Sequence, residues 1–146
     1  MIKPEIVIVH CSATPDFVEG DTNLDKFGAE HINAWHVQRG WKKIGYHIVI
    51  RRTGEIELGR KMDFDSGLVE IGAHCKDHNS NSIGVCYIGT KSPTQTQFDS
   101  FVMVYDFLKI FFKIEKENWF PHCHFNPNKL CPGIPMEYLK KLFSNY

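Results

Sequence analysis

Short β-branched runs alternate along the chain with longer segments of helical spacing. The apolar run Glu5–Val9 (EIVIV) predicts a buried strand that delivers His10 at its end. From about Asp25, apolar side chains recur every three or four residues, which predicts a helix over 25–39 that Gly40 ends. The chain therefore opens with a strand followed by a helix.

The middle of the chain combines a hairpin pattern with a long polar segment. The β-rich runs Tyr46–Arg51 and Glu55–Leu58 flank Thr53-Gly54, a turn sequence, and predict a hairpin. The following segment, Gly59–Ser82, has little periodicity and several glycines. A loop of this length is uncommon in a compact domain unless it has a function, so we expect it to line a site.

The C-terminal half begins with a strand and a long helix. The run Ile83–Ile88 predicts a buried strand. Thr94 and Gln97 form a T-x-x-Q capping box before an amphipathic pattern that predicts a core helix over about Gln95–Lys116. Two more elements are expected, a short strand at Trp119–Phe120 leading into His122 and a docked helix around Met136–Phe143.

The order of these elements predicts the fold class. A strand, helix, two strands, loop, strand, helix, strand and helix indicate an α/β fold with a central mixed β-sheet flanked by helices. No repeat, linker or low-complexity segment divides the 146 residues, so we expect a single domain over 1–146.

Charge and composition exclude several functions. The 17 Lys and Arg balance the 17 Asp and Glu, which leaves no basic surplus to hold a nucleic acid. The most apolar region, 101–112, contains Asp106 and Lys109 and is too short to span a membrane. The first residues lack the apolar core of a signal peptide, so we expect synthesis in the cytoplasm.

Histidines and cysteines offer the clearest chemistry. The five cysteines cannot all pair and are interpreted as thiols. One dense cluster, PHCHFNPNKLCPG, brings His122, Cys123, His124 and Cys131 within ten residues. Imidazole and thiolate suit Zn²⁺, and the cluster lacks the Cys-x-x-Cys pairs of structural zinc fingers. An open zinc site of the catalytic kind is therefore favoured over a closed structural one.

Four ordered segments carry a resemblance to a known family. They are VHCSAT, GYHIVI, IGAHCKDHNSNSIGVCYIG and HCHFNPNKLCPG, and they extend over about residues 5–135. These segments resemble the motifs of type 2 N-acetylmuramoyl-L-alanine amidases, the zinc-dependent family of phage lysins that is related to peptidoglycan recognition proteins. Four motifs in order are far more specific than one short pattern. The resemblance implies an amidase or peptidoglycan-recognition-like fold.

The resemblance also implies a set of metal ligands. His10, His122 and Cys131 match the family's three zinc ligands, which leave a fourth position on Zn²⁺ for water. The chain departs from the family at His124, where an acidic residue is usual. Spacing alone leaves His124 as an alternative to His122, which we favour because the family's ligand directly precedes this variable position. Without the acidic residue, another group must orient an imidazole.

Further site residues follow from the same resemblance. Tyr46 and Lys129 match the catalytic positions of family members with a Cys ligand. Lys129 would stabilise the oxyanion of the attacked amide, and Tyr46 would handle a proton or position the water. His74 and Asn81 lie in the segment that borders the family's substrate cleft and are expected to bind substrate.

Strand alternation and composition assign other residues to structural roles. His47 should face the opposite side of the sheet from Tyr46, and Cys11 should point away from His10. Cys86, within an apolar strand, is expected in the core.

These expectations combine into one functional hypothesis. The chain is predicted to be a monomeric zinc amidase that cleaves the bond between N-acetylmuramic acid and L-alanine in peptidoglycan, with no nucleic-acid partner. A phage-type lysin is favoured over a delivered toxin, and either would act on peptidoglycan outside the cytoplasm. Two alternatives stay open, a peptidoglycan-binding module without catalysis and a zinc ion that only ties the C-terminal loop to the sheet. The sequence identifies no immunity or regulatory protein.

Overall fold

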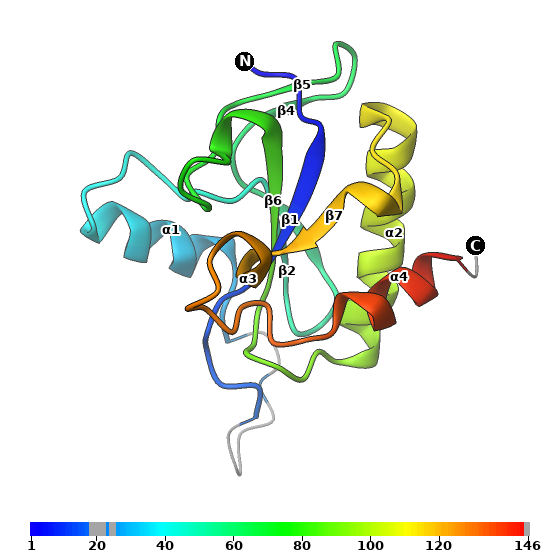
Figure 1. Ribbon diagram of the computed structural model, residues 1–146. Coiled ribbons are helices and arrows are strands. Elements are labelled where there is room, and N and C mark those ends of the chain that lie inside the picture. Colours follow the sequence, from blue (N-terminus) through cyan, green and yellow to red (C-terminus); the bar gives the residue numbers. More distant parts are fainter. Residues whose placement is uncertain (18–22, 24–25, 145–146) are drawn as a thin grey trace.

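The computed structural model describes residues 1–17, 23 and 26–144, and its centre is a five-stranded sheet (Figure 1). The strand order is β3-β2-β6-β1-β7. The strands of this sheet are β1 (Ile6–Cys11), β2 (Ile48–Ile50), β3 (Ile56–Leu58), β6 (Ser82–Tyr87) and β7 (Trp119–Pro121). Strand β1 pairs in parallel with β6 and β7, and β2 pairs in parallel with β6 but antiparallel with β3. The mixed sheet predicted from the element order is confirmed.

Helices cover both faces of this sheet. Helix α1 (Ala29–Gln38) lies on one face, and α2 (Gln95–Phe112) and α4 (Met136–Ser144) lie on the other (Figure 1). A four-residue helix, α3 (His122–Phe125), follows β7 at once. Among the described residues, no helix is long and apolar enough to span a bilayer.

Alternation along the strands divides the core into two clusters. Ile48 and Ile50 pack toward α2, whereas Val49 between them packs with Ile32 of α1. Strand β6 follows the same rule, because Val85 belongs to the larger cluster and its neighbour Cys86 to the smaller. The expected core position of Cys86 is confirmed, since its side chain is fully buried.

The capping box of α2 forms as predicted. Thr94 Oγ1 accepts a hydrogen bond from the backbone N–H of Gln97, and Gln97 Oε1 accepts one from the backbone N–H of Thr94. The buried Gln97 amide also donates to the carbonyl oxygens of Ile50 and Ile88. One side chain therefore fixes both the start of α2 and its position on β2 and β6.

Several predicted boundaries need correction. Helix α1 begins at Ala29, later than predicted, and residue 25, where the predicted helix began, lies outside the described residues. Helix α2 ends at Phe112, because Lys113 adopts a left-handed conformation with φ of 60° and its N–H returns to the carbonyl of Leu108. Ile114 is the only apolar residue among the six after Phe112, so the pattern fades without marking an exact end.

The segment 59–82 is more ordered than a loop. It contains a two-stranded ribbon, β4 (Met62–Asp63) with β5 (Leu68–Val69), and a 3₁₀ turn, η1 (Asn79–Asn81). Strands of two residues are too short to show a period, which explains why the pattern missed them. A second 3₁₀ turn, η2 (Lys116–Asn118), precedes β7.

Candidate metal centre

Two parallel strands bring the predicted ligands to one edge of the sheet. His10 is the penultimate residue of β1, and His122 directly follows β7, its parallel neighbour. Cys131 reaches the same place from the loop after α3. One ligand atom from each of His10, His122 and Cys131 lies within 4.8 Å of the others. Residues far apart in sequence thus form one compact group.

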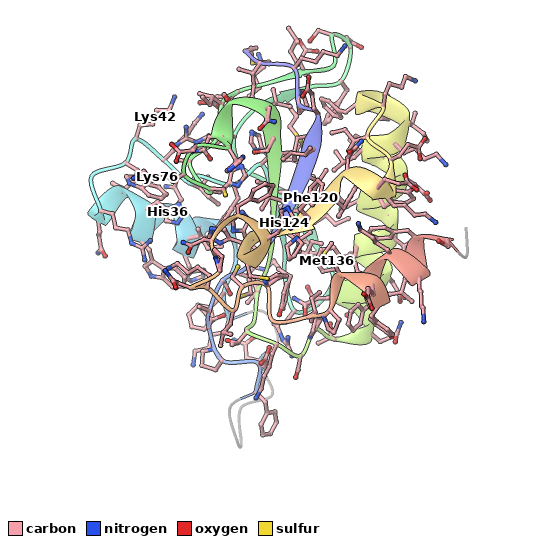
Figure 2. The ribbon with its side chains drawn as sticks, viewed as in Figure 1. His36, Lys42, Lys76, Phe120, His124 and Met136 are labelled. Atoms are coloured by element: carbon pink, nitrogen blue, oxygen red, sulfur yellow. The ribbon has the colours of Figure 1, made fainter. Side chains whose placement is uncertain are left out.

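The alternative ligand His124 lies outside this group. Its ring packs against Phe120 at a centroid separation of 5.0 Å and is exposed to solvent (Figure 2). The ring of His122, in contrast, lies 4.4 Å from that of His10. The geometry therefore favours His122 as the partner of His10 and Cys131.

Both histidines of the group are held in their neutral form. Burial lowers the pKa of His10 well below its ordinary value, and the charges of His74 and His122 lower it further. Burial also lowers the pKa of His122, with a smaller contribution from the Lys129 ammonium. A neutral imidazole keeps one nitrogen lone pair, which a metal ion requires.

The sulfur of Cys131 lies at the end of β1. Its Sγ accepts a hydrogen bond from the backbone N–H of Cys11 at 3.1 Å, which favours a thiolate, but the neighbouring Cys11 thiol and burial hold the pKa of Cys131 above its ordinary value. A bound metal cation would favour the thiolate. The Cys11 side chain packs with Val7 and Val9 in the cluster under α2, on the opposite face from His10, as alternation predicted. Cys11 nevertheless borders the site, because its backbone N–H and its thiol both hydrogen-bond with the Cys131 thiol and the residue lines the cavity.

The chemistry of the three donors fits Zn²⁺. Two neutral imidazoles and one thiolate form a borderline to soft ligand set, and zinc commonly takes three such ligands when a fourth position serves a substrate or water. The group also borders a cavity of about 360 Å³ rather than being enclosed. These residues therefore could hold zinc in an arrangement of the catalytic kind.

Tyr46 and Lys129 line the same cavity. The Tyr46 ring lies 5.0 Å from the His10 ring. Burial raises the pKa of the Tyr46 hydroxyl well above its ordinary value, and the nearby thiols of Cys86, Cys131 and Cys11 raise it further. A protonated hydroxyl donates a hydrogen bond, so this residue is suited to positioning rather than to removing a proton. Lys129 is exposed at the rim.

Comparison with known families places this site in context. Residues 2–134 match the family model described as N-acetylmuramoyl-L-alanine amidase. The chain belongs to this amidase family. The resemblance noted in the sequence is therefore confirmed.

Curated relatives, two phage endolysins among them, match this chain over part of their length. The chain is 43% identical over 81 residues to an endolysin of Enterobacteria phage K11, covering 56% of this chain and 45% of that protein. It is 38% identical over 85 residues to the endolysin of Escherichia phage T7, covering 58% and 48% of the two chains. These alignments span about half the length of the curated relatives.

Solved structures share the fold of this chain over nearly its full length. LysC, an N-acetylmuramoyl-L-alanine amidase of Clostridium intestinale, superposes with a TM-score of 0.79 at 24% identity, covering 98% of this chain and 87% of LysC. Drosophila PGRP-LB superposes with a TM-score of 0.71 at 24% identity, covering 99% and 81% of the two chains. The expected amidase and peptidoglycan-recognition fold is confirmed.

The two residues predicted to bind substrate, His74 and Asn81, differ in placement. His74 lines the cavity, but its Nδ1 lies 2.9 Å from His10 Nε2 and its Nε2 lies 3.2 Å from Ser82 Oγ. Asn81 is not among the residues that line the cavity, and its buried Oδ1 has no hydrogen-bond partner within the described ranges. The side chain of Asn79 instead fixes the segment, because its Oδ1 accepts the backbone N–H groups of His74 and Cys75.

His47, beside His74, has a structural role as predicted. It is fully buried, and its Nδ1 accepts a hydrogen bond from the backbone N–H of Gly84. Its Nε2 therefore carries the proton and donates to the carbonyl of Glu70 at 2.6 Å. Both partners are backbone groups, so His47 joins β6 to the preceding segment.

The sequence did not reveal the wall of the cavity formed by α1. Trp35, His36 and Arg39 line it, together with Trp41 just beyond the helix. The spacing of Trp35 and Arg39, four residues apart, was the available signal, because it places both on one side of a helix.

Proposed function

We propose that this chain is a zinc-dependent amidase that hydrolyses the amide bond between N-acetylmuramic acid and L-alanine in peptidoglycan. The observation that carries the proposal is the convergence of His10, His122 and Cys131 beside a cavity that Tyr46 and Lys129 also line. Family membership supplies the identity of the bond.

The residues around the cavity suit amide hydrolysis. His10, His122 and Cys131 would hold Zn²⁺, which when bound supplies a Lewis acid that polarises a carbonyl and acidifies water. The ammonium of Lys129 can approach the amide oxygen as it gains negative charge, a stabilisation realised in the transition state. The Tyr46 hydroxyl can donate a hydrogen bond to the same developing charge or orient the attacking water.

A peptidoglycan-binding module without catalysis is the second candidate. It is supported by relatives such as PGRP-LE, whose structure in complex with tracheal cytotoxin superposes with a TM-score of 0.71. Against it stand Cys131, Tyr46 and Lys129, because members that only bind typically lack the cysteine ligand. The enzyme is therefore favoured.

The names of the curated relatives support a lysin over a delivered toxin. The phage K11 and phage T7 proteins are both endolysins. By this analogy the protein would be made in an infected bacterium and reach peptidoglycan during lysis.

Mass spectrometry of digested peptidoglycan tests the proposal. Purified peptidoglycan is incubated with zinc-loaded protein, with protein treated with a chelator, and with a Cys131→Ala variant. Free stem peptides that begin with L-alanine are expected only with the zinc-loaded wild type. A Cys123→Ala variant is the matched control, because this thiol lies on α3 outside the metal group and should leave activity unchanged.

Two other results would contradict the proposal. Peptidoglycan that is bound but left uncut would support the recognition module instead. Unfolding on chelation, without any hydrolysis before it, would support a purely structural zinc.

A further inference from the structure

A chain of hydrogen bonds begins at His10 and leads away from the metal group. His10 Nε2 lies 2.9 Å from His74 Nδ1, and His74 Nε2 lies 3.2 Å from Ser82 Oγ. The chain ends where the Ser82 hydroxyl donates to the carbonyl oxygen of His78 at 2.7 Å. Ser82, the first residue of β6, is fully buried.

The hydrogen bond from Ser82 to His78 determines which atom donates in each of the other hydrogen bonds. A carbonyl oxygen only accepts, so the single proton of the Ser82 hydroxyl is committed to His78. Ser82 Oγ must then accept a proton from His74 Nε2, which leaves Nδ1 of a neutral His74 ring without one. That bare nitrogen accepts from His10 Nε2, so His10 is protonated at Nε2 and bare at Nδ1.

The residues around the His74 ring fix its position. A Cβ at either Gly72 or Gly84 would lie 2.7 Å from His74 Cδ2, so only glycine leaves room for the ring at both positions. Asn79 holds the backbone of His74 from the other side. The ring is half-buried at the cavity wall, and its two nitrogens face His10 and Ser82 rather than a carboxylate that would favour a second proton, so the ring is neutral. Position and proton content are both fixed.

We infer that His74 and Ser82 are positioning residues that hold His10 in the tautomer whose Nδ1 can bind the metal ion. This inference deepens the proposed function and rests on it. It also identifies a group that orients one imidazole of the site. The sequence left this group open, because His124 stands where the family usually has an acidic residue. Both ring nitrogens of His74 are occupied, which leaves neither for a substrate.

Nitrogen NMR of histidine side chains tests the inference directly. In the metal-free wild type, the ¹⁵N signals of His10 should show a proton on Nε2 and none on Nδ1. On addition of zinc, the Nδ1 signal should shift as the metal binds it. A His10 protonated at Nδ1, or a metal bound to Nε2, would overturn the inference.

Zinc affinity, measured by competition with a chromophoric chelator, gives an independent test. A His74→Phe variant keeps a ring but lacks an acceptor and should bind zinc about 10–100-fold more weakly, the usual cost of losing an orienting partner. A His74→Asn variant keeps an acceptor oxygen near the Nδ1 position and should recover most of the affinity. Circular dichroism checks that each variant is folded.

Ser82→Ala tests the far end of the chain. Without its acceptor the His74 ring is free to change tautomer, so His10 should show NMR signals of both forms, with zinc affinity reduced about tenfold. Ser100→Ala is the matched control, because this buried serine also donates to a backbone carbonyl, that of Gly54, but lies on α2 away from the site. It should leave both readouts unchanged.

The possible failures separate clearly. If His74→Phe or Ser82→Ala binds zinc as tightly as the wild type, the positioning role is wrong while the proposed amidase stands. If the wild type itself binds no zinc, the proposed function falls and this inference falls with it.

Discussion

The two faces of the sheet bury different kinds of side chain. Under α2 and α4 the core consists of large apolar side chains, with Tyr105 stacked on Phe143 at 4.3 Å and Trp119 packed edge-on against the same ring. The α1 side has a smaller apolar cluster, and its cavity is bordered by the histidine rings of His10, His36 and His74.

Because of this difference, one face contributes most of the folding stability and the other carries the candidate site. Burial of aromatic side chains is the larger source of folding free energy, and most of it lies on the face away from the metal group. The α1 face instead buries imidazoles whose nitrogens must all be satisfied, which costs free energy unless each has a partner. Substitutions on the two faces should therefore affect different measurements.

The largest effect is expected at the metal group. His122→Ala should lower hydrolysis of peptidoglycan by several orders of magnitude and weaken zinc binding, because one of three ligands is lost. His124→Ala, two residues away, should leave both nearly unchanged. Assays of stem-peptide release and zinc competition compare the pair, and loss of activity in the His124 variant alone would reverse the ligand assignment.

The opposite face should respond in stability alone. Phe101→Ala removes a fully buried ring that packs near Tyr87, and it should lower the free energy of unfolding by about 3–5 kcal/mol. Urea denaturation measures this change. Below its unfolding transition the variant should retain wild-type zinc affinity, and a large loss of that affinity in folded protein would show that the two faces are coupled.

A change at the cavity rim should affect rate without affecting stability. Lys129→Met removes an exposed ammonium at the cavity rim, so under the proposed function kcat should fall about 10²–10³-fold, as when a transition-state donor is lost. Lys141→Met, on the exposed surface of α4, is the control and should have no effect. Equal losses in the two variants would point to general electrostatics instead.

The smallest effect concerns pH. Burial lowers the pKa of His36 to about 4, helped by the charges of Arg39 and Arg60, and its Nδ1 accepts the backbone N–H of Gly45. The unfolded chain takes up a proton near pH ~6.5. The stabilising contribution of neutral His36 is therefore complete above that pH and is lost as pH falls toward about 4.

A His36→Asn variant isolates this term, because the Asn oxygen can accept the same N–H without titrating. Between pH ~6.5 and ~4, chelator-treated wild type should lose on the order of 1 kcal/mol more stability than the variant. Urea denaturation at several pH values measures the difference. Identical pH slopes would assign the loss to the other buried histidines.

Most of the features that could be predicted from the sequence are set by residues close together in the chain. Strand β1, the hairpin of β2 and β3 and the capping box at Thr94 depend on neighbouring residues, and each formed as expected. The group of His10, His122 and Cys131 was found through motif resemblance, and spacing alone left His124 open.

The features that the sequence did not predict depend on contacts between residues far apart in the chain. The inferred role of His74 depends on Ser82 Oγ and on the space left by Gly72 and Gly84. The periodicity of apolar residues in the sequence gives no sign of these contacts. The cavity wall at Trp35 and Arg39 depends on how α1 docks. The ribbon of β4 and β5 is too short to give a pattern.

The separation of the ligands along the chain has a consequence for loop entropy. His10 and Cys131 lie near opposite ends, so a shared ion would close a loop of about 120 residues, as a cross-link does. Strand β7, at the edge of the sheet, is aligned with β1 over only three register pairs, starting at Val7 and Trp119. The ion would therefore act as a clasp on this edge strand, and its removal would let the sheet begin to open between β1 and β7.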